Sequence, residues 1–211
     1  TPSNLRELPD ILAKIREMGV MTWSVFFLVP TGRGQHLPQL TPQQADDVLN
    51  FCYDADKIVS LKTTEAPSFR RVCVQRTVCE RLGLDPVTEL GLGVDYQHLS
   101  ERLAELGLEG ADHLRRPPLR VNAARGFVFI SHTGDVYPSG FLPSPAGNVR
   151  EQALPDIYRS SDLFVALRDP DAPPGRCGRC EFRQVCGGSP PRAFGATADL
   201  LAVDPLCAYD P

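Results

Sequence analysis

Residues 176–211 read RCGRCEFRQVCGGSPPRAFGATADLLAVDPLCAYDP and contain four of the seven cysteines in the chain. These four are spaced C-x2-C-x5-C, then twenty residues, then the last cysteine, and they are Cys177, Cys180, Cys186 and Cys207. Two thiolates three positions apart reach one metal centre across a tight turn, and the other two complete a set of four. Four thiolates are the ligands of a structural zinc ion or of an iron–sulfur cluster. The spacing alone leaves both metals open.

The composition is that of a globular protein. A chain of 211 residues with 42% hydrophobic residues is long enough for one large domain or two small ones. The net charge of −4 and the pI of about 5.6 argue against a nucleic-acid or anionic membrane surface as a partner. No apolar run approaches the ~18 residues of a membrane span. An odd number of cysteines disfavours a disulfide framework, so we expect a reducing, cytoplasmic compartment.

Helices and strands are expected to alternate in the first 83 residues. The apolar run VMTWSVFFLV at residues 20–29 predicts a strand buried on both faces. Thr41, Pro42 and Gln44 suit an N-cap, a first-turn proline and a capping box, so they predict the start of a helix. The expected order is helix 9–18, strand 20–29, helix from 41, strand 58–61 and helix 68–82. This alternation indicates an α/β fold with a parallel sheet.

A less regular segment follows and leads into a hairpin. Residues 84–94 are expected to form a linker or an active-site loop, and Asp95 is expected to cap the helix that follows. A domain boundary is expected within residues 107–119, which hold two glycines and two prolines. The expected elements beyond it are a hairpin of strands 126–131 and 136–138, an edge pairing at 148–149, and short helices over 155–160 and 162–168.

Four segments of the second half together resemble a known domain. They are FISHTGDVYPSGF (129–141), GNVRE (147–151), CGRCEFRQVCGGS (177–189) and DPLCAYDP (204–211). Their order and spacing resemble the auxiliary-cluster domain, of the SPASM or shorter twitch type, found in radical S-adenosylmethionine (radical SAM) enzymes. In the first half, WSVFFLVPTGRG (23–34) and KTTEAPSFRRV (62–72) are similar to the last βα units of the radical SAM partial barrel.

This resemblance implies a division of the chain and a metal centre. Residues 1–83 would be the C-terminal part of a partial TIM barrel, 84–120 a linker with one helix, and 121–211 a SPASM/twitch domain with a β-hairpin, short helices and the cysteine loop. The four cysteines of residues 176–211 would hold one auxiliary 4Fe–4S cluster. Four arginines near them could offset its negative charge, with a solvated surface as the alternative: Arg176, Arg179, Arg183 and Arg192.

The chain departs from the family pattern in two ways. The C-x3-C-x2-C motif that holds the S-adenosylmethionine-cleaving cluster is absent, because the other cysteines, Cys52, Cys73 and Cys79, have the wrong spacing. We therefore expect a C-terminal part of a longer enzyme, with further strands and that motif upstream of Thr1; alone, it is not expected to be competent. Ser139 stands where a ligand of a second auxiliary cluster often lies, so one auxiliary cluster is expected.

The resemblance also implies an activity. In such enzymes a radical made from S-adenosylmethionine modifies a substrate, here a peptide or a tetrapyrrole-like molecule, with electrons from a flavodoxin- or ferredoxin-type donor. Lys62, Thr63 and Glu65 follow a predicted parallel strand at the end where ligands collect. With Arg33 from the loop after the other strand, they are the expected cofactor-binding residues. The alternative is a Lys–Glu pair closing a loop and a solvent-facing arginine.

Two other functions stay open. The first is a non-enzymatic interaction module stabilised by zinc on the same four cysteines. The second is an inactive, truncated fragment. Metal content separates the first from the enzyme, because a cluster contains about four irons where a structural site contains one zinc.

Overall fold

The computed structural model describes residues 1–108, 121–173 and 175–211, and these form two compact units. The first unit comprises the described parts of 1–27, 37–118 and 206–208. The second unit comprises the described parts of 28–36, 119–205 and 209–211. The boundary expected within residues 107–119 lies largely outside the described residues, so the three-part division of the chain stays a prediction.

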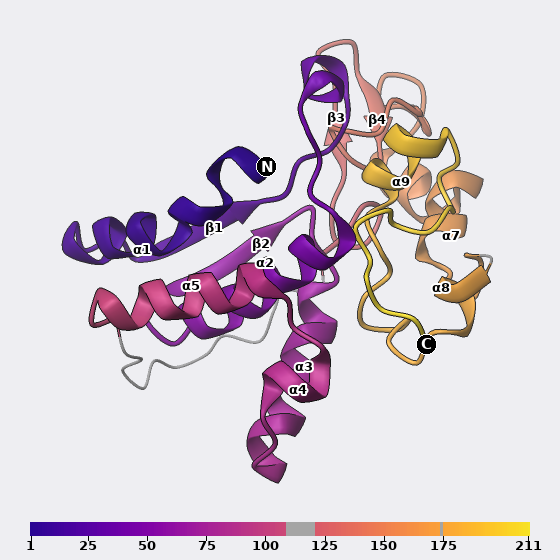
Figure 1. The fold of residues 1–211 in the computed structure, drawn as a ribbon. Helices are drawn as coiled ribbons and strands as arrows, with labels where there is room; N and C mark the ends of the chain where they lie inside the picture. Colours follow the sequence, from indigo (N-terminus) through magenta and orange to yellow (C-terminus); the bar gives the residue numbers. More distant parts are fainter. Residues whose placement is uncertain (109–120, 174) are drawn as a thin grey trace. The chain divides into compact units, whose positions relative to one another are not determined.

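The first unit is an α/β arrangement around two parallel strands (Figure 1). Its elements are a 3₁₀ helix η1 (Pro2–Glu7), α1 (Leu8–Glu17), β1 (Thr22–Phe26), α2 (Pro42–Ala55), β2 (Ser60–Thr64), α3 (Phe69–Leu82), α4 (Pro86–Leu90) and α5 (Val94–Glu105). β1 pairs with β2 from Thr22↔Ser60 to Phe26↔Thr64, and α2 packs against both α3 and α5. The expected parallel pair is therefore confirmed. None of the described helices is both long and apolar enough to cross a membrane.

Local signals account for the helix ends near β1. The Thr41 hydroxyl accepts from the Gln44 backbone N–H at 3.1 Å, and the Gln44 side chain accepts from the Thr41 N–H at 3.1 Å. This is the predicted capping box at the start of α2. α1 is followed by Gly19 at φ +67°, a left-handed conformation that glycine adopts at little cost. Both helix boundaries follow from residues within a few positions.

The two strands differ from their expected form. β1 is shorter than 20–29 and is not buried on both faces, since Val25 is buried while Phe26 is 52% exposed. Side chains alternate across a strand, and only one face of β1 meets the core. β2 begins two residues later than expected, because the N–H groups of Ile58 and Val59 bond back to Ala55 of α2 at 2.9 and 3.0 Å.

The segment after α3 contains two helices in its described part instead of one. Asp85 caps α4 by accepting from the Thr88 backbone N–H at 3.0 Å. α5 begins at Val94 without Asp95 as its cap. The buried carboxylate of Asp47 in α2 instead accepts from the Gly93 N–H at 2.8 Å and the Tyr96 N–H at 3.3 Å. A residue distant in the sequence therefore supplies the cap of α5.

The second unit is built on a three-stranded antiparallel sheet in the order β3-β4-β5. Its elements are a 3₁₀ helix η2 (Gly32–His36), β3 (Phe129–Ile130), β4 (Asp135–Tyr137), β5 (Gly147–Asn148), α6 (Leu154–Ser160), α7 (Asp162–Arg168), α8 (Gly175–Arg179) and α9 (Pro190–Thr197). The predicted hairpin is confirmed, although β3 is shorter than the expected 126–131, and the edge pairing lies one residue earlier than expected. Six buried residues form its core: Ala124, Val136, Leu142, Ile157, Phe164 and Leu167. The helix α8, which contains Cys177, and the helix α9, which begins after Ser189, were not expected.

Candidate metal centre

The first three cysteines lie on one tightly turned loop of the second unit. Cys177 is part of α8, and the Cys180 backbone N–H bonds to its carbonyl at 3.3 Å. The Cys186 N–H bonds to the Phe182 carbonyl at 2.8 Å, so another turn separates the second and third cysteines. All three side chains are partly exposed. We call residues 177–189 the cysteine loop.

Two glycines let the cysteine loop turn after Cys186. Gly187 and Gly188 have φ of +75° and +60°, which residues with a Cβ rarely adopt. The Asn122 side-chain amide donates to the Gly188 carbonyl at 2.8 Å. A Cβ on Gly187 would lie 3.4 Å from that same amide nitrogen. The left-handed turn therefore requires the two glycines, whereas the contact with Asn122 alone would tolerate a Cβ.

A buried ion pair connects the end of the cysteine loop to the chain before Cys207. Arg192 in α9 donates from Nη1 to both carboxylate oxygens of Asp204, at 3.0 and 2.8 Å. The exposed fractions of the two residues are 1% and 4%. Asp204 also accepts from the Ser189 backbone N–H at 3.1 Å. The chain three residues before Cys207 is therefore bound to the last residue of the cysteine loop.

The chain after Cys207 is bound to the same loop. The ring of Tyr209 packs edge-on against Phe182 with centroids 5.2 Å apart. Its hydroxyl donates to the carboxylate of Glu181, and this hydrogen bond lowers the pKa of Glu181 below its ordinary value. Asp204 and Tyr209 thus anchor the stretch that carries Cys207 on both sides.

Tyr209→Phe is expected to raise the pKa of Glu181 back toward its ordinary value of 4.5, since the phenylalanine ring keeps the packing but lacks the donor. A carboxyl whose pKa is lowered by folding adds stability above its unfolded pKa. That contribution is lost as the pH falls through the folded pKa. NMR titration of the Glu181 side chain measures the shift, with Tyr137→Phe as a control that should leave it unchanged. An unaltered Glu181 pKa in Tyr209→Phe would contradict the assigned donor.

The four cysteines fit a metal centre by their chemistry. All seven cysteines of the chain are described and none forms a disulfide. In the described residues, no three His, Cys, Asp or Glu side chains converge to hold one metal ion. A four-iron cluster takes its thiolates on separate iron atoms, so it needs them more widely spread than one ion does. Cys177, Cys180 and Cys186 belong to the second unit and Cys207 to the first, and the ligand set stays a prediction.

The residues expected to bind a cofactor are divided between the units. Lys62 and Thr63 lie within β2, where Lys62 is exposed and the Thr63 hydroxyl donates to the Ala66 carbonyl at 3.2 Å. Glu65 follows at φ +57°, an unusual conformation for a residue with a Cβ. Arg33 is an exposed residue of η2 in the second unit. Lys62, Thr63 and Glu65 therefore lie around one strand end of the first unit, whereas Arg33 belongs to the second unit.

The arginines near the cysteine loop differ in their surroundings. Arg192 is buried against Asp204, so the alternative of a solvated surface residue is wrong for it. Arg183 donates from Nε to Asp171 at 2.7 Å at the surface, and from Nη1 to the Cys180 carbonyl at 3.3 Å. Arg183 is therefore tied directly to the loop's backbone. The pairing of Asp204 with Arg192 was not predicted from the sequence. The signal that could have indicated it is a carboxylate among the apolar residues before Cys207.

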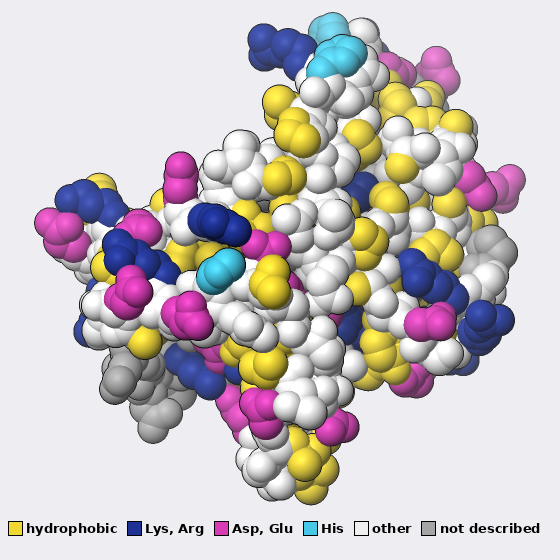
Figure 2. Space-filling model, in the orientation of Figure 1, with side chains coloured by type: hydrophobic (Ala, Val, Ile, Leu, Met, Phe, Trp, Pro, Cys, Tyr) yellow, Lys and Arg dark blue, Asp and Glu magenta, His cyan; other side chains and the backbone are white. Residues whose placement is uncertain are grey.

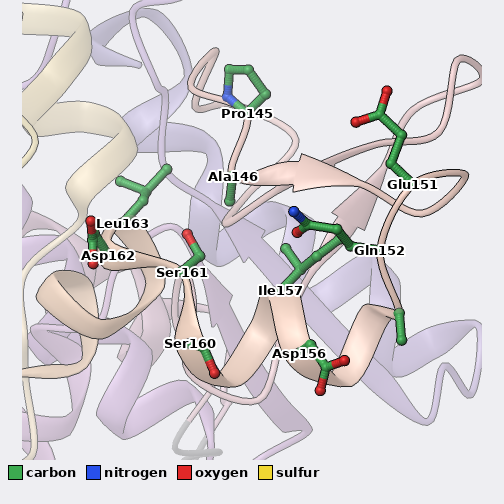
Figure 3. Close-up of a pocket in the computed structure, with 11 residues that line it drawn as sticks. Pro145, Ala146, Glu151, Gln152, Asp156, Ile157, Ser160, Ser161, Asp162 and Leu163 are labelled. Carbon is green, nitrogen blue, oxygen red and sulfur yellow. The ribbon is translucent and has the colours of Figure 1, made fainter.

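A groove of about 830 Å³ lies in the second unit along α6 and the start of α7 (Figure 3). Gln152 lies beside Ile157 in this groove. The acidic residues that line the groove are Glu151, Asp156 and Asp162. No cysteine lines it. On the face shown in Figure 2, basic and acidic side chains are interspersed over α1 and α5 at the left of the view. Positive and negative charges are therefore mixed in this region of the surface.

Comparisons with known proteins indicate the kind of domain that contains the start of the cysteine loop. Residues 122–181 match the SPASM family, an iron–sulfur cluster-binding domain. An AdoMet-dependent heme synthase of Methanosarcina barkeri is 34% identical over 99% of this chain and 54% of its own length. That of Oleidesulfovibrio alaskensis is 37% identical over 100% of this chain and 50% of its length. A PqqA peptide cyclase of Xanthomonas oryzae is 33% identical over 40% of the chain and 24% of its length.

The chain spans about half the length of the two heme synthases that it matches. The matched domain begins at Asn122, beside the hairpin, and ends just after Cys180. The chain therefore contains a SPASM iron–sulfur cluster-binding domain at residues 122–181, and over its whole length it is similar to AdoMet-dependent heme synthases.

Proposed function

We propose that this chain is the auxiliary-cluster part of a radical SAM enzyme and that Cys177, Cys180, Cys186 and Cys207 bind one 4Fe–4S cluster. The match of residues 122–181 to an iron–sulfur cluster-binding domain carries this proposal. The anchoring of the chain on both sides of Cys207 to the cysteine loop supports it. Four thiolates would occupy one position on each iron, which favours electron transfer or a structural role over substrate ligation.

The first unit is proposed to be the last part of a partial barrel. Its parallel strands β1 and β2 are joined through α2, as in a βαβ unit. Two strands alone make a sheet of low stability, so the proposal includes further strands from the rest of the protein. Lys62, Thr63 and Glu65 would then lie at the strand ends where barrels bind ligands. The backbone strain at Glu65 supports a role for this loop in binding S-adenosylmethionine or the substrate.

A tetrapyrrole is the proposed class of substrate. The two heme synthases match 99% and 100% of the chain, including the first unit, where barrel residues contact substrate in this proposal. The peptide cyclase matches only 40% of it. The extent of similarity therefore favours a tetrapyrrole over a peptide. Absorbance titration of the whole protein with an iron-free porphyrin, against a peptide of matched charge, tests this choice. Saturable binding of the peptide alone would contradict it.

Metal content tests the proposed cluster. The whole protein, purified without oxygen, is compared with a variant in which Cys177, Cys180 and Cys186 are all alanine. The variant is expected to contain about four fewer irons and about four fewer sulfides per chain, because one complete cluster is lost. A loss of one zinc with unchanged iron would instead support the zinc-stabilised module. Equal metal content in both proteins would refute a metal centre on these cysteines.

A further inference from the structure

The pair Arg192–Asp204 joins three segments of the second unit. Beyond its two bonds to Asp204, Arg192 donates from Nε to the Leu28 carbonyl at 3.1 Å. Asp204 in turn accepts from the N–H of Ser189. The pair therefore connects the end of the cysteine loop, the approach to Cys207 and the segment 28–36.

The segment 28–36 is held closely by the same helix. A Cβ placed on Gly195 of α9 would lie 3.0 Å from both the carbonyl oxygen and Cγ of Pro30. This separation is tighter than nine in ten real Cβ contacts, so a glycine at this position permits the close approach of α9 to Pro30. The segment also carries Arg33. Arg192 thus binds the start of the 28–36 segment at Leu28, and Gly195 allows Pro30 to pack closely against the same helix.

Stability alone does not explain a pair of this kind. Two charges removed from water lose their hydration, and apolar residues of similar volume often stabilise a protein as well or better. An ion pair differs from an apolar contact in its directionality, because a guanidinium and a carboxylate meet in few geometries. The Arg192–Asp204 pair therefore suits a function in which the relative position of backbone segments has to be fixed.

We propose that Arg192 and Asp204 are positioning residues that hold the backbone after Cys186 and before Cys207 in the register that retains the cluster. This inference rests on the proposed function, since it requires a cluster on these cysteines. Neither residue is a ligand in this proposal. Loss of the pair is expected to loosen the placement of the third and fourth thiolates, so that iron is released faster and the environment of the cluster changes.

Three variants of the whole protein test this positioning role. Asp204→Asn keeps the size and an acceptor for Ser189 but removes the charge. Arg192→Lys keeps the charge but lacks the planar fork that reaches Asp204 and Leu28 together. Each is expected to release iron to a chelator about tenfold faster than the wild type, as for other groups that orient metal ligands. The electron paramagnetic resonance spectrum of the reduced cluster should change as well.

The third variant separates positioning from stability. Arg192→Met combined with Asp204→Leu replaces both charges by apolar side chains, so it is expected to recover the melting temperature lost in Asp204→Asn. Its release of iron should stay fast, because the directional contacts are still missing. Recovery of slow release together with the melting temperature would overturn the proposal, since the pair would then act only through stability.

A matched control lies in the first unit. Asp46 forms a comparably buried pair with Arg71, the exposed fractions of the side chains being 9% and 5%. Asp46→Asn should lower the stability of the protein while the release of iron stays at the wild-type rate. Asp204→Asn that also released iron at that rate would overturn the inference and leave the cluster itself intact. A wild-type protein without cysteine-bound iron would overturn the proposed function and this inference together.

Discussion

Cys180→Ala is expected to remove the auxiliary cluster and to lower the melting temperature of the second unit by about 10 °C or more. Metal-binding energy in a small domain is largely folding energy. Apolar packing gives the second unit limited stability without the cluster, because its core cluster contains six buried residues in the part of the chain that the structure describes. Cys180 also lies between two turns of the cysteine loop. Backbone hydrogen bonds in these turns join Cys180 to Cys177 and Cys186 to Phe182. Iron content and calorimetry of the whole protein measure the two effects.

Cys73→Ala is the matched control for this prediction. Cys73 is a partly buried thiol of α3 in the first unit, where it packs against the core. Its replacement should leave the iron content unchanged and alter the melting temperature modestly. Wild-type iron content and melting temperature in Cys180→Ala would refute the role of this cysteine as a ligand.

Arg76→Leu is expected to destabilise the first unit by about 3 kcal/mol. Arg76 in α3 donates to both oxygens of Asp54, at 2.6 and 3.1 Å, and to the Tyr96 hydroxyl at 3.3 Å. Its side chain is 6% exposed, so its removal leaves a carboxylate in a partly buried site. Lys57 still lies 3.5 Å from Asp54 and limits the loss. The expected cost is therefore at the lower end of the range for a broken buried pair.

Urea denaturation followed by tryptophan fluorescence measures this loss. Trp23 is the sole tryptophan of the chain, and its ring lies 6.4 Å from that of the buried Phe51 in the first unit. Its emission therefore reports on the unfolding of this unit. Arg102→Leu, which breaks an exposed pair with Asp10, should shift the midpoint little. Equal midpoints for Arg76→Leu and Arg102→Leu would show that the buried network contributes no more than a surface pair.

Signals within a few residues predicted the parts of the fold that depend on local contacts. The capping box of Thr41 and Gln44 is one example, because both partners belong to the same turn. The hairpin around Gly134 is another, since glycine at φ +93° closes the turn between two apolar runs. The parallel pairing of β1 and β2 followed from the alternation of strands and helices.

Contacts between distant residues could not be predicted in this way. α5 begins at Val94 because Asp47 bonds to Gly93 across 46 positions, which no local pattern records. The exposure of Phe26 was also missed, because an apolar run does not show which face of a strand is covered. The start of α5 and the exposure of Phe26 both depend on which other elements pack nearby.

The sequence by itself predicted a donor set of four cysteines from their spacing, since four thiolates suit a zinc ion or an iron–sulfur cluster in any surroundings. Only the tertiary structure showed that Arg192 is buried with Asp204 and bonded to Leu28, 164 positions away. The physical reason is that the energy of a charge depends on what surrounds it. The same guanidinium is a solvated surface group or a buried anchor according to neighbours that only the folded chain brings together.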